Sequence, residues 1–143
     1  MKHKKQAQAY ARYFESISPD TLDTLAGMLS DKVVFIDPFN RMVGRDAMGG
    51  VFGYMFETMR EPRFEVLDLA YSDNRAYMKW RMTGIVNAAP KMRFDILGMS
   101  EVEFDDAGYV TLHHDHWDSA SQLLSQLPYI GWITERIMRL FVH

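Results

Sequence analysis

The chain has 143 residues, of which 48% are hydrophobic and 24% are charged, a composition typical of one ordinary globular domain. It contains no cysteine, which excludes disulfides, cysteine zinc sites and thiol catalysis. The net charge of -3 lacks the basic excess of a nucleic-acid-binding domain, and no apolar run approaches the roughly 20 residues of a membrane span. We therefore expect a single cytoplasmic domain over residues 1–143, with no nucleic-acid partner and no membrane span.

Apolar spacing predicts two helices at the start of the chain. The first apolar side chains recur every three or four residues and so share one helical face: Tyr10, Tyr13, Phe14 and Ile17. This spacing predicts a helix over residues 5–16. The run Ser18-Pro19-Asp20 combines an N-cap, a first-turn proline and a favourable acidic charge, and predicts that a second helix begins there.

A strand and a third helix follow. The β-branched run from Val33 to Ile36 predicts a strand, and Asp37-Pro38 ends it because proline cannot donate to a sheet ladder. Residues 46–59 carry an apolar face at helical spacing, which predicts the third helix.

The second half of the chain changes from helical spacing to alternation. Four runs are typical of strands and are separated by turn-forming residues: 64–71, 75–86, 92–104 and 109–117. Two short helices, near 119–126 and 128–141, are expected in a C-terminal helical extension over 119–143. Helices followed by an antiparallel meander favour an α+β fold, with helices packed on one face of a curved sheet. Leu97 and Met99 lie on the opposite face, which predicts cover by a second subunit and hence a homodimer.

Asp37 is the first candidate for chemistry. A carboxylate at the end of a buried strand is partly desolvated, which favours proton uptake and suits a general base. The same residue is also typical of a turn, in which its side chain caps its neighbours. Both interpretations stay open on the local sequence.

The second candidate is the run His113-His114-Asp115-His116-Trp117-Asp118. Alternation puts His113, Asp115 and Trp117 on one face of a strand, without identifying which face is buried. A histidine and an aspartate two residues apart can share a proton or fix each other's tautomer. His114 and His116 have the strand spacing of a metal-binding pair, but zinc usually needs a third protein ligand and none is evident, so no metal is predicted. An ion-paired strand end is the plain structural alternative.

Aromatic and methionine side chains supply the remaining candidates. Tyr13 lies on the apolar face of the first predicted helix and is either a core aromatic or a hydrogen-bond donor to a substrate oxygen. Soft and aromatic side chains form the core by default, and they line a ligand pocket if the core is hollow. The candidates for such a lining are Trp80, Trp117, Phe52, Phe56, Tyr54 and Met78.

The order of elements, Tyr13, the phrase from Val33 to Pro38 and the later Val43-Gly44-Arg45-Asp46-Ala47 resemble the NTF2-like superfamily. Within it, the sequence is most similar to the SnoaL-like proteins and the ketosteroid isomerases. The resemblance extends to about Ser119 and implies an NTF2-like (cystatin-like) cone, in which a curved antiparallel sheet carries helices on its concave face. In the ketosteroid isomerases the general base is the Asp of a similar strand-end Asp-Pro, which Asp37 matches. Their oxyanion-hole Tyr precedes it on the first helix, which Tyr13 matches.

Further site positions follow from the resemblance. The second oxyanion donor of the ketosteroid isomerases is a protonated Asp on a later strand, where this sequence has Ser100, a weaker donor. SnoaL-like cyclases and epoxide hydrolases carry an Asp on the last long strand, in a phrase similar to the one around Asp115. The resemblance therefore implies that Asp115 and His113 point into the cone and share one pocket with Asp37.

Together these features predict a cofactor-independent isomerase or cyclase that acts on a small apolar or polycyclic carbonyl compound, without a metal. Asp37 would remove a proton next to the carbonyl, and Tyr13 with Ser100 would stabilise the enolate oxygen. Asp115, paired with His113, would return or relay the proton. Activation of water for hydration or epoxide opening is an alternative within the enzyme class. Outside it, the alternative is a non-catalytic module that binds an apolar ligand or a partner protein, because a fold does not fix a function.

Overall fold

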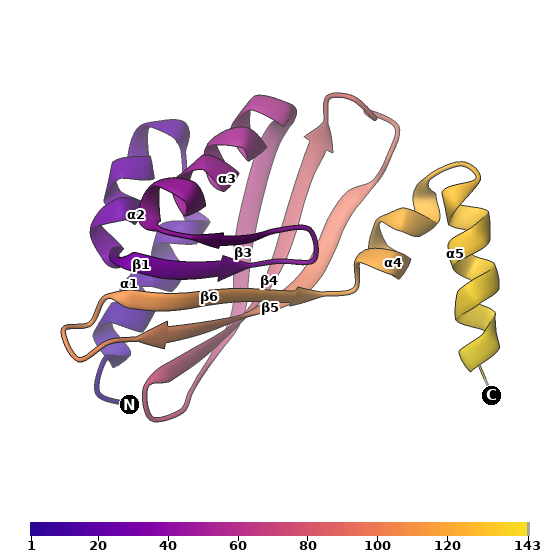
Figure 1. The fold of residues 1–143 in the computed structure, drawn as a ribbon. Coiled ribbons are helices and arrows are strands. Elements are labelled where there is room, and N and C mark those ends of the chain that lie inside the picture. Colours follow the sequence, from indigo (N-terminus) through magenta and orange to yellow (C-terminus); the bar gives the residue numbers. More distant parts are fainter. Residues whose placement is uncertain (143) are drawn as a thin grey trace.

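The apolar helix faces and alternating strands of the sequence assemble into an α+β fold, described by a computed structural model for residues 1–142 (Figure 1). A curved six-stranded sheet carries α1, α2 and α3 on its concave face. The helices are α1 (Lys4–Glu15), α2 (Leu22–Met28), α3 (Arg45–Thr58), α4 (Ser119–Gln122) and α5 (Ile130–Met138). The strands are β1 (Leu29–Ile36), β2 (Arg41–Val43), β3 (Met59–Tyr71), β4 (Arg75–Val86), β5 (Phe94–Phe104) and β6 (Val110–Trp117). Short 3₁₀ turns are η1 (Pro19–Thr21), η2 (Leu124–Gln126) and η3 (Arg139–Phe141).

The strand order of the sheet is β2-β1-β6-β5-β4-β3. The predicted meander from β3 to β6 is antiparallel throughout, but β1 pairs with β6 in parallel. This pairing brings the chain's first long strand beside its last one. Phe35 therefore lies opposite His113, and on the other side of β6, Ser100 of β5 lies opposite Asp115.

The core lies between the concave face of the sheet and the three helices. Tyr10 and Phe14 of α1 and Phe52 of α3 are buried there against inward side chains of the strands. Gly98 on β5 leaves room for the Trp80 indole, because a Cβ at this glycine would lie 2.5 Å from the Trp80 ring. The absence of a side chain at this position thus lets a large aromatic lie across the neighbouring strand.

Three strands differ from the sequence prediction. β1 begins at Leu29, four residues before the predicted start at Val33. β3 begins at Met59, whereas the alternation predicted residue 64, and it runs through Pro62 with a register shift and Glu61 at a φ of 51°. The proline is tolerated because β3 is the edge strand of the sheet. β2 was not predicted, since three residues offer no periodicity to detect.

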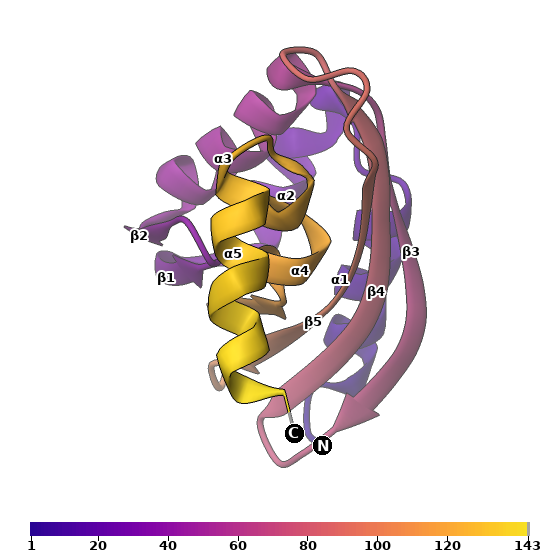
Figure 2. The ribbon, with the colours of Figure 1, turned by 90° about the vertical axis from the view of Figure 1, so that its right-hand side faces the viewer.

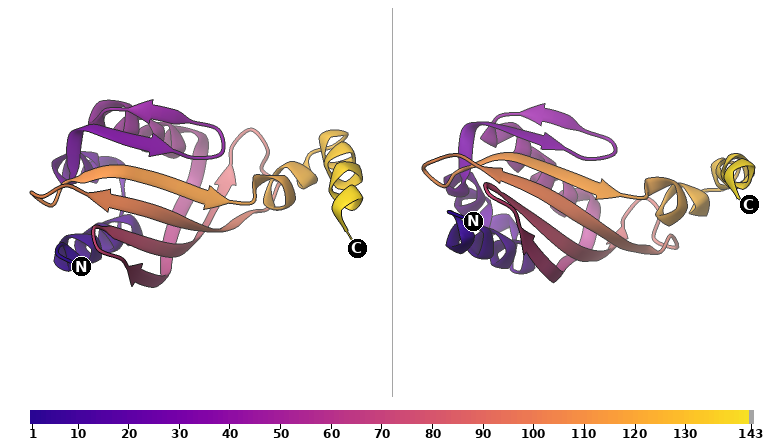
Figure 3. Two further views of the ribbon diagram at one scale, coloured as in Figure 1. Left: turned by 60° about the horizontal axis from the view of Figure 1, so that its bottom comes forward. Right: turned by 90° about the horizontal axis from the view of Figure 1, so that it is seen from below.

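The C-terminal helices leave the body of the domain at the end of β6 (Figures 2 and 3). The side-chain amide of Gln122 bonds both the N–H and the carbonyl of Leu97, and Gln126 does the same at Arg93. These bonds cover the part of β5 that extends beyond β6, which would otherwise be an open edge. α5 then projects away from the sheet, with Trp132 65% exposed.

Three further expectations concern the homodimer, the C-terminal extension and membrane spans. Leu97 and Met99 lie on the outer face of the sheet about half exposed, so the predicted homodimer stays a prediction. Residue 143, the end of the predicted extension, lies outside the described residues. Within residues 1–142, no helix is long and apolar enough to cross a membrane.

Candidate functional site

The inward face of β6 carries the polar centre of the domain. The parallel pairing with β1 and the antiparallel pairing with β5 turn His113, Asp115 and Trp117 toward the concave side, as the resemblance implied. His113 is buried, with its ring between the aromatic rings of Phe14 and Phe35, and the Asp115 side chain retains 16% of its exposure.

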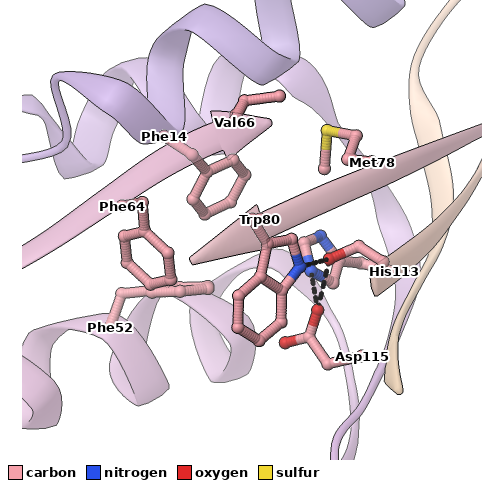
Figure 4. A pocket seen from close by; sticks show the side chains of 9 residues that line it. Phe14, Phe52, Phe64, Val66, Met78, Trp80, His113 and Asp115 are labelled. Carbon is pink, nitrogen blue, oxygen red and sulfur yellow. Dashed lines mark hydrogen bonds and ion pairs between the residues drawn. The ribbon is translucent and has the colours of Figure 1, made fainter. Parts of the chain in front are cut away.

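Asp115 is held through one of its two oxygens (Figure 4). The Ser100 hydroxyl donates to Oδ1 at 2.5 Å, and Nε2 of His113 lies 2.8 Å from the same oxygen. The Trp80 indole N–H in turn donates to the Ser100 hydroxyl at 2.8 Å, which leaves the Ser100 proton for Asp115. Among the described residues, Asp115 Oδ2 has no hydrogen-bond partner. The carboxylate is therefore fixed in orientation while one oxygen keeps its capacity to accept a proton.

Tyr10 completes this network from α1. Its hydroxyl lies 2.8 Å from Nδ1 of His113 and is buried. Burial, reinforced by the negative charge of Asp115, raises the pKa of the Tyr10 phenol well above its ordinary value. A protonated phenol donates to Nδ1, which leaves the proton of a neutral imidazole on Nε2, where it points at Asp115. Tyr10 thus donates to His113, and His113 donates to Asp115.

An apolar cavity of about 440 Å³ opens beside Asp115. Its walls come mainly from α3 and from β3 through β6, with further side chains from β1, from the turn after β1 and from Leu123. They are mostly aromatic or methionine side chains, including Phe52, Met55, Phe64, Trp80, Phe94 and Trp117. Asp37 and Asp115 are the only carboxylates that line it among residues 1–142. A cavity of this size and character suits a small apolar molecule with one polar group.

A second and smaller space of about 20 Å³, called the inner space below, is lined by Trp80 and by side chains around it (Figure 4). Ser100, His113 and Asp115 supply its polar lining, and Phe14 and Met78 are among its apolar walls. This volume is enough for about one water molecule with polar partners. Asp115, Phe52, Phe64 and Trp80 line both spaces, so Asp115 stands at the boundary between them.

Asp37 lies at the same large cavity but is engaged differently. Its Oδ1 accepts the backbone N–H groups of Phe39 and Asn40, at 2.7 and 2.6 Å. The Asn40 side-chain amide donates to both carboxylate oxygens, at 3.1 and 3.0 Å. The turn-forming interpretation of Asp37 is thus realised, and its carboxylate also reaches the cavity.

The two predicted oxyanion donors already donate to other groups of the protein. The Tyr13 hydroxyl donates to the carbonyl of Thr21 at 2.9 Å, and Tyr13 does not line either space. Ser100 lies within the site, but its hydroxyl donates its proton to a hydrogen bond with Asp115. The tyrosine that joins the site is Tyr10, one helical turn earlier on the same face of α1, and the shared face was the available signal.

The predicted ligand-binding side chains are brought together with one exception. Trp80, Trp117, Phe52 and Tyr54 line the large cavity, and Met78 lines the inner space. Tyr54 is 67% exposed and stands at the rim. Phe56 lines neither space, although it follows Phe52 by four residues on α3.

Comparison with solved structures relates this architecture to known folds. A ketosteroid isomerase-like protein from Catenulispora acidiphila, solved with trimethylamine, has a TM-score of 0.73 at 14% identity and covers 90% of this chain and 97% of its own. An LEH-like epoxide hydrolase from M. tuberculosis has a TM-score of 0.68 at 16% identity and covers 96% of both chains. A putative polyketide cyclase from Xanthomonas campestris has a TM-score of 0.67 at 15% identity and covers 84% of this chain and 93% of its own. At these identities the likeness concerns the fold.

Sequence comparison identifies the family. No curated protein matches the chain. The family model for the SnoaL-like domain matches residues 10–113, which include Tyr10, Asp37, Trp80, Ser100 and His113. The chain therefore belongs to the SnoaL-like domain family and has the NTF2-like fold.

Proposed function

We propose that the protein is a cofactor-independent enzyme in which Asp115 is the general base for a small apolar or polycyclic carbonyl compound. The observation that carries this proposal is the free Oδ2 of a carboxylate whose Oδ1 is held by Ser100 and His113 at the cavity wall. A base must be oriented and must keep one unoccupied acceptor atom, and Asp115 combines both.

The reaction supported best is removal of a proton next to a carbonyl group. Asp115 Oδ2 takes the proton. The apolar walls exclude water, which strengthens the electrostatic interaction between a hydrogen-bond donor and the negative charge that develops on the carbonyl oxygen. Trp117 lines the cavity two residues from Asp115 on the same face, and its indole N–H makes no hydrogen bond among the described residues. We assign this N–H as the neutral donor to the enolate oxygen. The same carboxyl then returns the proton to another carbon, which completes an isomerisation. In a cyclising addition the enolate carbon instead bonds to a second carbonyl carbon of the substrate, whose C=O π bond breaks, and the carboxyl returns the proton to the alkoxide oxygen.

Water activation is a second candidate, favoured by the water-sized inner space that Ser100 and Asp115 line. A water held there by Asp115 and Ser100 would lose a proton to Asp115 and attack a carbon of an epoxide. The ring C–O bond breaks as the new one forms, and the proton held by Asp115 then passes to the alkoxide oxygen, which gives a diol. The similarity in fold to an LEH-like epoxide hydrolase supports testing this chemistry.

Deuterium exchange tests the proton transfer. The protein is incubated in heavy water with cyclic ketones, enones and polycyclic aromatic ketones, and mass spectrometry scores deuterium gained beside the carbonyl. We expect Asp115→Asn to lower the exchange rate by about 10²-fold or more. Asp37→Asn is the matched control at the same cavity, and we expect it to lower the rate less than about tenfold.

Two results would contradict this assignment. Equal losses in both variants would remove the distinction between the two carboxylates. Absence of exchange with every ketone, together with ligand-induced thermal stabilisation of both the original protein and Asp115→Asn, would favour a non-catalytic binding module. Incorporation of ¹⁸O from labelled water into diols, tested with a panel of epoxides, would instead identify the hydrolytic candidate.

A further inference from the structure

The opposite face of β6 gathers a second set of polar side chains. Alternation along the strand turns His114 and His116 away from the cavity, and the antiparallel register places Glu101 of β5 directly opposite His114. The two imidazole rings lie beside each other, with centroids 3.8 Å apart and an angle of 37° between their planes. His116 Nε2 lies 3.6 Å from Glu101 Oε2, and one potential ligand atom from each of the three residues lies within 4.8 Å of the others.

This set has the composition and the spacing of a divalent-metal site. Two imidazoles and one carboxylate, with a water as fourth ligand, are a known ligand set of zinc, which prefers tetrahedral coordination. Ligand atoms about 2.0–2.1 Å from a tetrahedral ion are about 3.3 Å apart, so the His116–Glu101 separation needs little change. His116 is exposed enough to adjust its rotamer, and the second imidazole is already beside it.

The surroundings also orient one of these three ligands. The Arg75 guanidinium donates to Glu101 Oε1 at 2.6 Å, which fixes the carboxylate while its other oxygen faces His116. A partner that orients a ligating carboxylate in this way is a usual feature of metal sites.

We propose that Glu101, His114 and His116 bind a divalent transition-metal ion, with Zn²⁺ as the type, on the outer face of the sheet. The ion would join β5 to β6 directly behind the Ser100–Asp115 hydrogen bond, since His114 and His116 flank Asp115 in sequence. Because only the folded chain presents the three ligands together, Zn²⁺ stabilises the fold and raises the melting temperature. The site is separate from the cavity, so it does not depend on the proposed function.

Metal titration of protein without a histidine tag tests this site. Isothermal titration calorimetry measures Zn²⁺ binding, and the visible absorption of Co²⁺ reports a tetrahedral nitrogen and oxygen environment. We expect one ion per chain, a Zn²⁺-dependent rise in melting temperature, and a loss of affinity of at least about tenfold in His116→Ala and in Glu101→Gln. The His116 side chain is half exposed and that of Glu101 is 20% exposed, and the melting temperatures of the metal-free variants establish that they fold.

Glu103→Gln is the matched control. Glu103 lies two residues from Glu101 on the same face and also binds Arg75, at 2.8 Å, but it is not part of the cluster. It should retain Zn²⁺ affinity within about twofold, because it removes the same charge without removing a ligand. Absence of saturable binding at one ion per chain, or binding that survives both His116→Ala and Glu101→Gln, would overturn the proposal and leave His116 and Glu101 as a simple ion pair.

Discussion

Asp37 and Asp115 line the same cavity, yet they are held by different kinds of partner. Asp37 is held within its own turn, by backbone and side-chain groups of residues 39 and 40. Asp115 is held by side chains of β5 and β6, which are themselves supported from β4 and α1. A turn satisfies a carboxylate locally and would form around it in many folds. A network drawn from four elements exists only in the assembled domain, and it leaves one oxygen of Asp115 unoccupied.

The largest expected effect comes from removing the central partner of Asp115. His113→Ala should lower the free energy of unfolding by about 3–5 kcal/mol, because it opens a cavity among aromatic rings and leaves the Tyr10 hydroxyl without a partner. Urea denaturation measures the change. His116→Ala, in metal-free buffer, is the control on the outward face of the same strand and should cost no more than about 0.5 kcal/mol. Similar losses of unfolding free energy in the two variants would show that the inward network contributes no more to stability than the outward face of the strand does.

Tyr10→Phe tests the far end of the network and adds a pH dependence. At pH 7 we expect a loss of about 1–2 kcal/mol, because Nδ1 of His113 loses its donor while the ring packing stays. The folded-state pKa of Tyr10 is raised, so the stability that it contributes is complete below its unfolded pKa of about 10 and is lost as the pH rises toward the folded pKa. Above pH 10 the free energy of unfolding of the original protein should therefore fall by up to about 1.4 kcal/mol per pH unit through this group. The difference in the free energy of unfolding between the original protein and Tyr10→Phe should then become smaller.

Urea unfolding at pH 7, 10 and 11 measures how the stability difference between the original protein and Tyr10→Phe changes with pH. Tyr54→Phe is the matched control, since Tyr54 is mostly exposed and should leave the pH profile unchanged. A gap between Tyr10→Phe and the original protein that stays constant with pH would mean that Tyr10 ionises alike in the folded and unfolded chains.

The sequence was informative where a pattern is local and less so where partners come from afar. Strand alternation placed His113, Asp115 and Trp117 on one face, and the family resemblance indicated that this face is the inner one. The resemblance points to Tyr13, whereas the tyrosine in the network is Tyr10. Both lie on the same helical face, and only the packing of α1 decides which hydroxyl reaches His113.

The same limit applies to the outer face of the sheet. The pairing of β5 with β6 sets Glu101 opposite His114, and strand register is not visible in the spacing of either strand alone. The sequence therefore showed two aligned histidines without the third group beside them. Similarly, the parallel pairing of β1 with β6 joins segments from opposite ends of the chain, and no local period encodes that contact.

The smallest expected effect tests the other half of the comparison, the turn around Asp37. Asn40→Ala removes the amide that contacts both oxygens of Asp37, but two backbone N–H groups continue to donate to Oδ1. We expect a loss of at most about 1 kcal/mol in urea denaturation, since the turn keeps its backbone bonds. Deuterium exchange should stay within about twofold of the original rate, whereas Ser100→Ala, the corresponding change at Asp115, should lower it at least about tenfold. If Asn40→Ala slows exchange as much as Ser100→Ala does, the orientation of Asp37 matters to the reaction, and the locally held carboxylate is as much a part of the active site as the one held by the network.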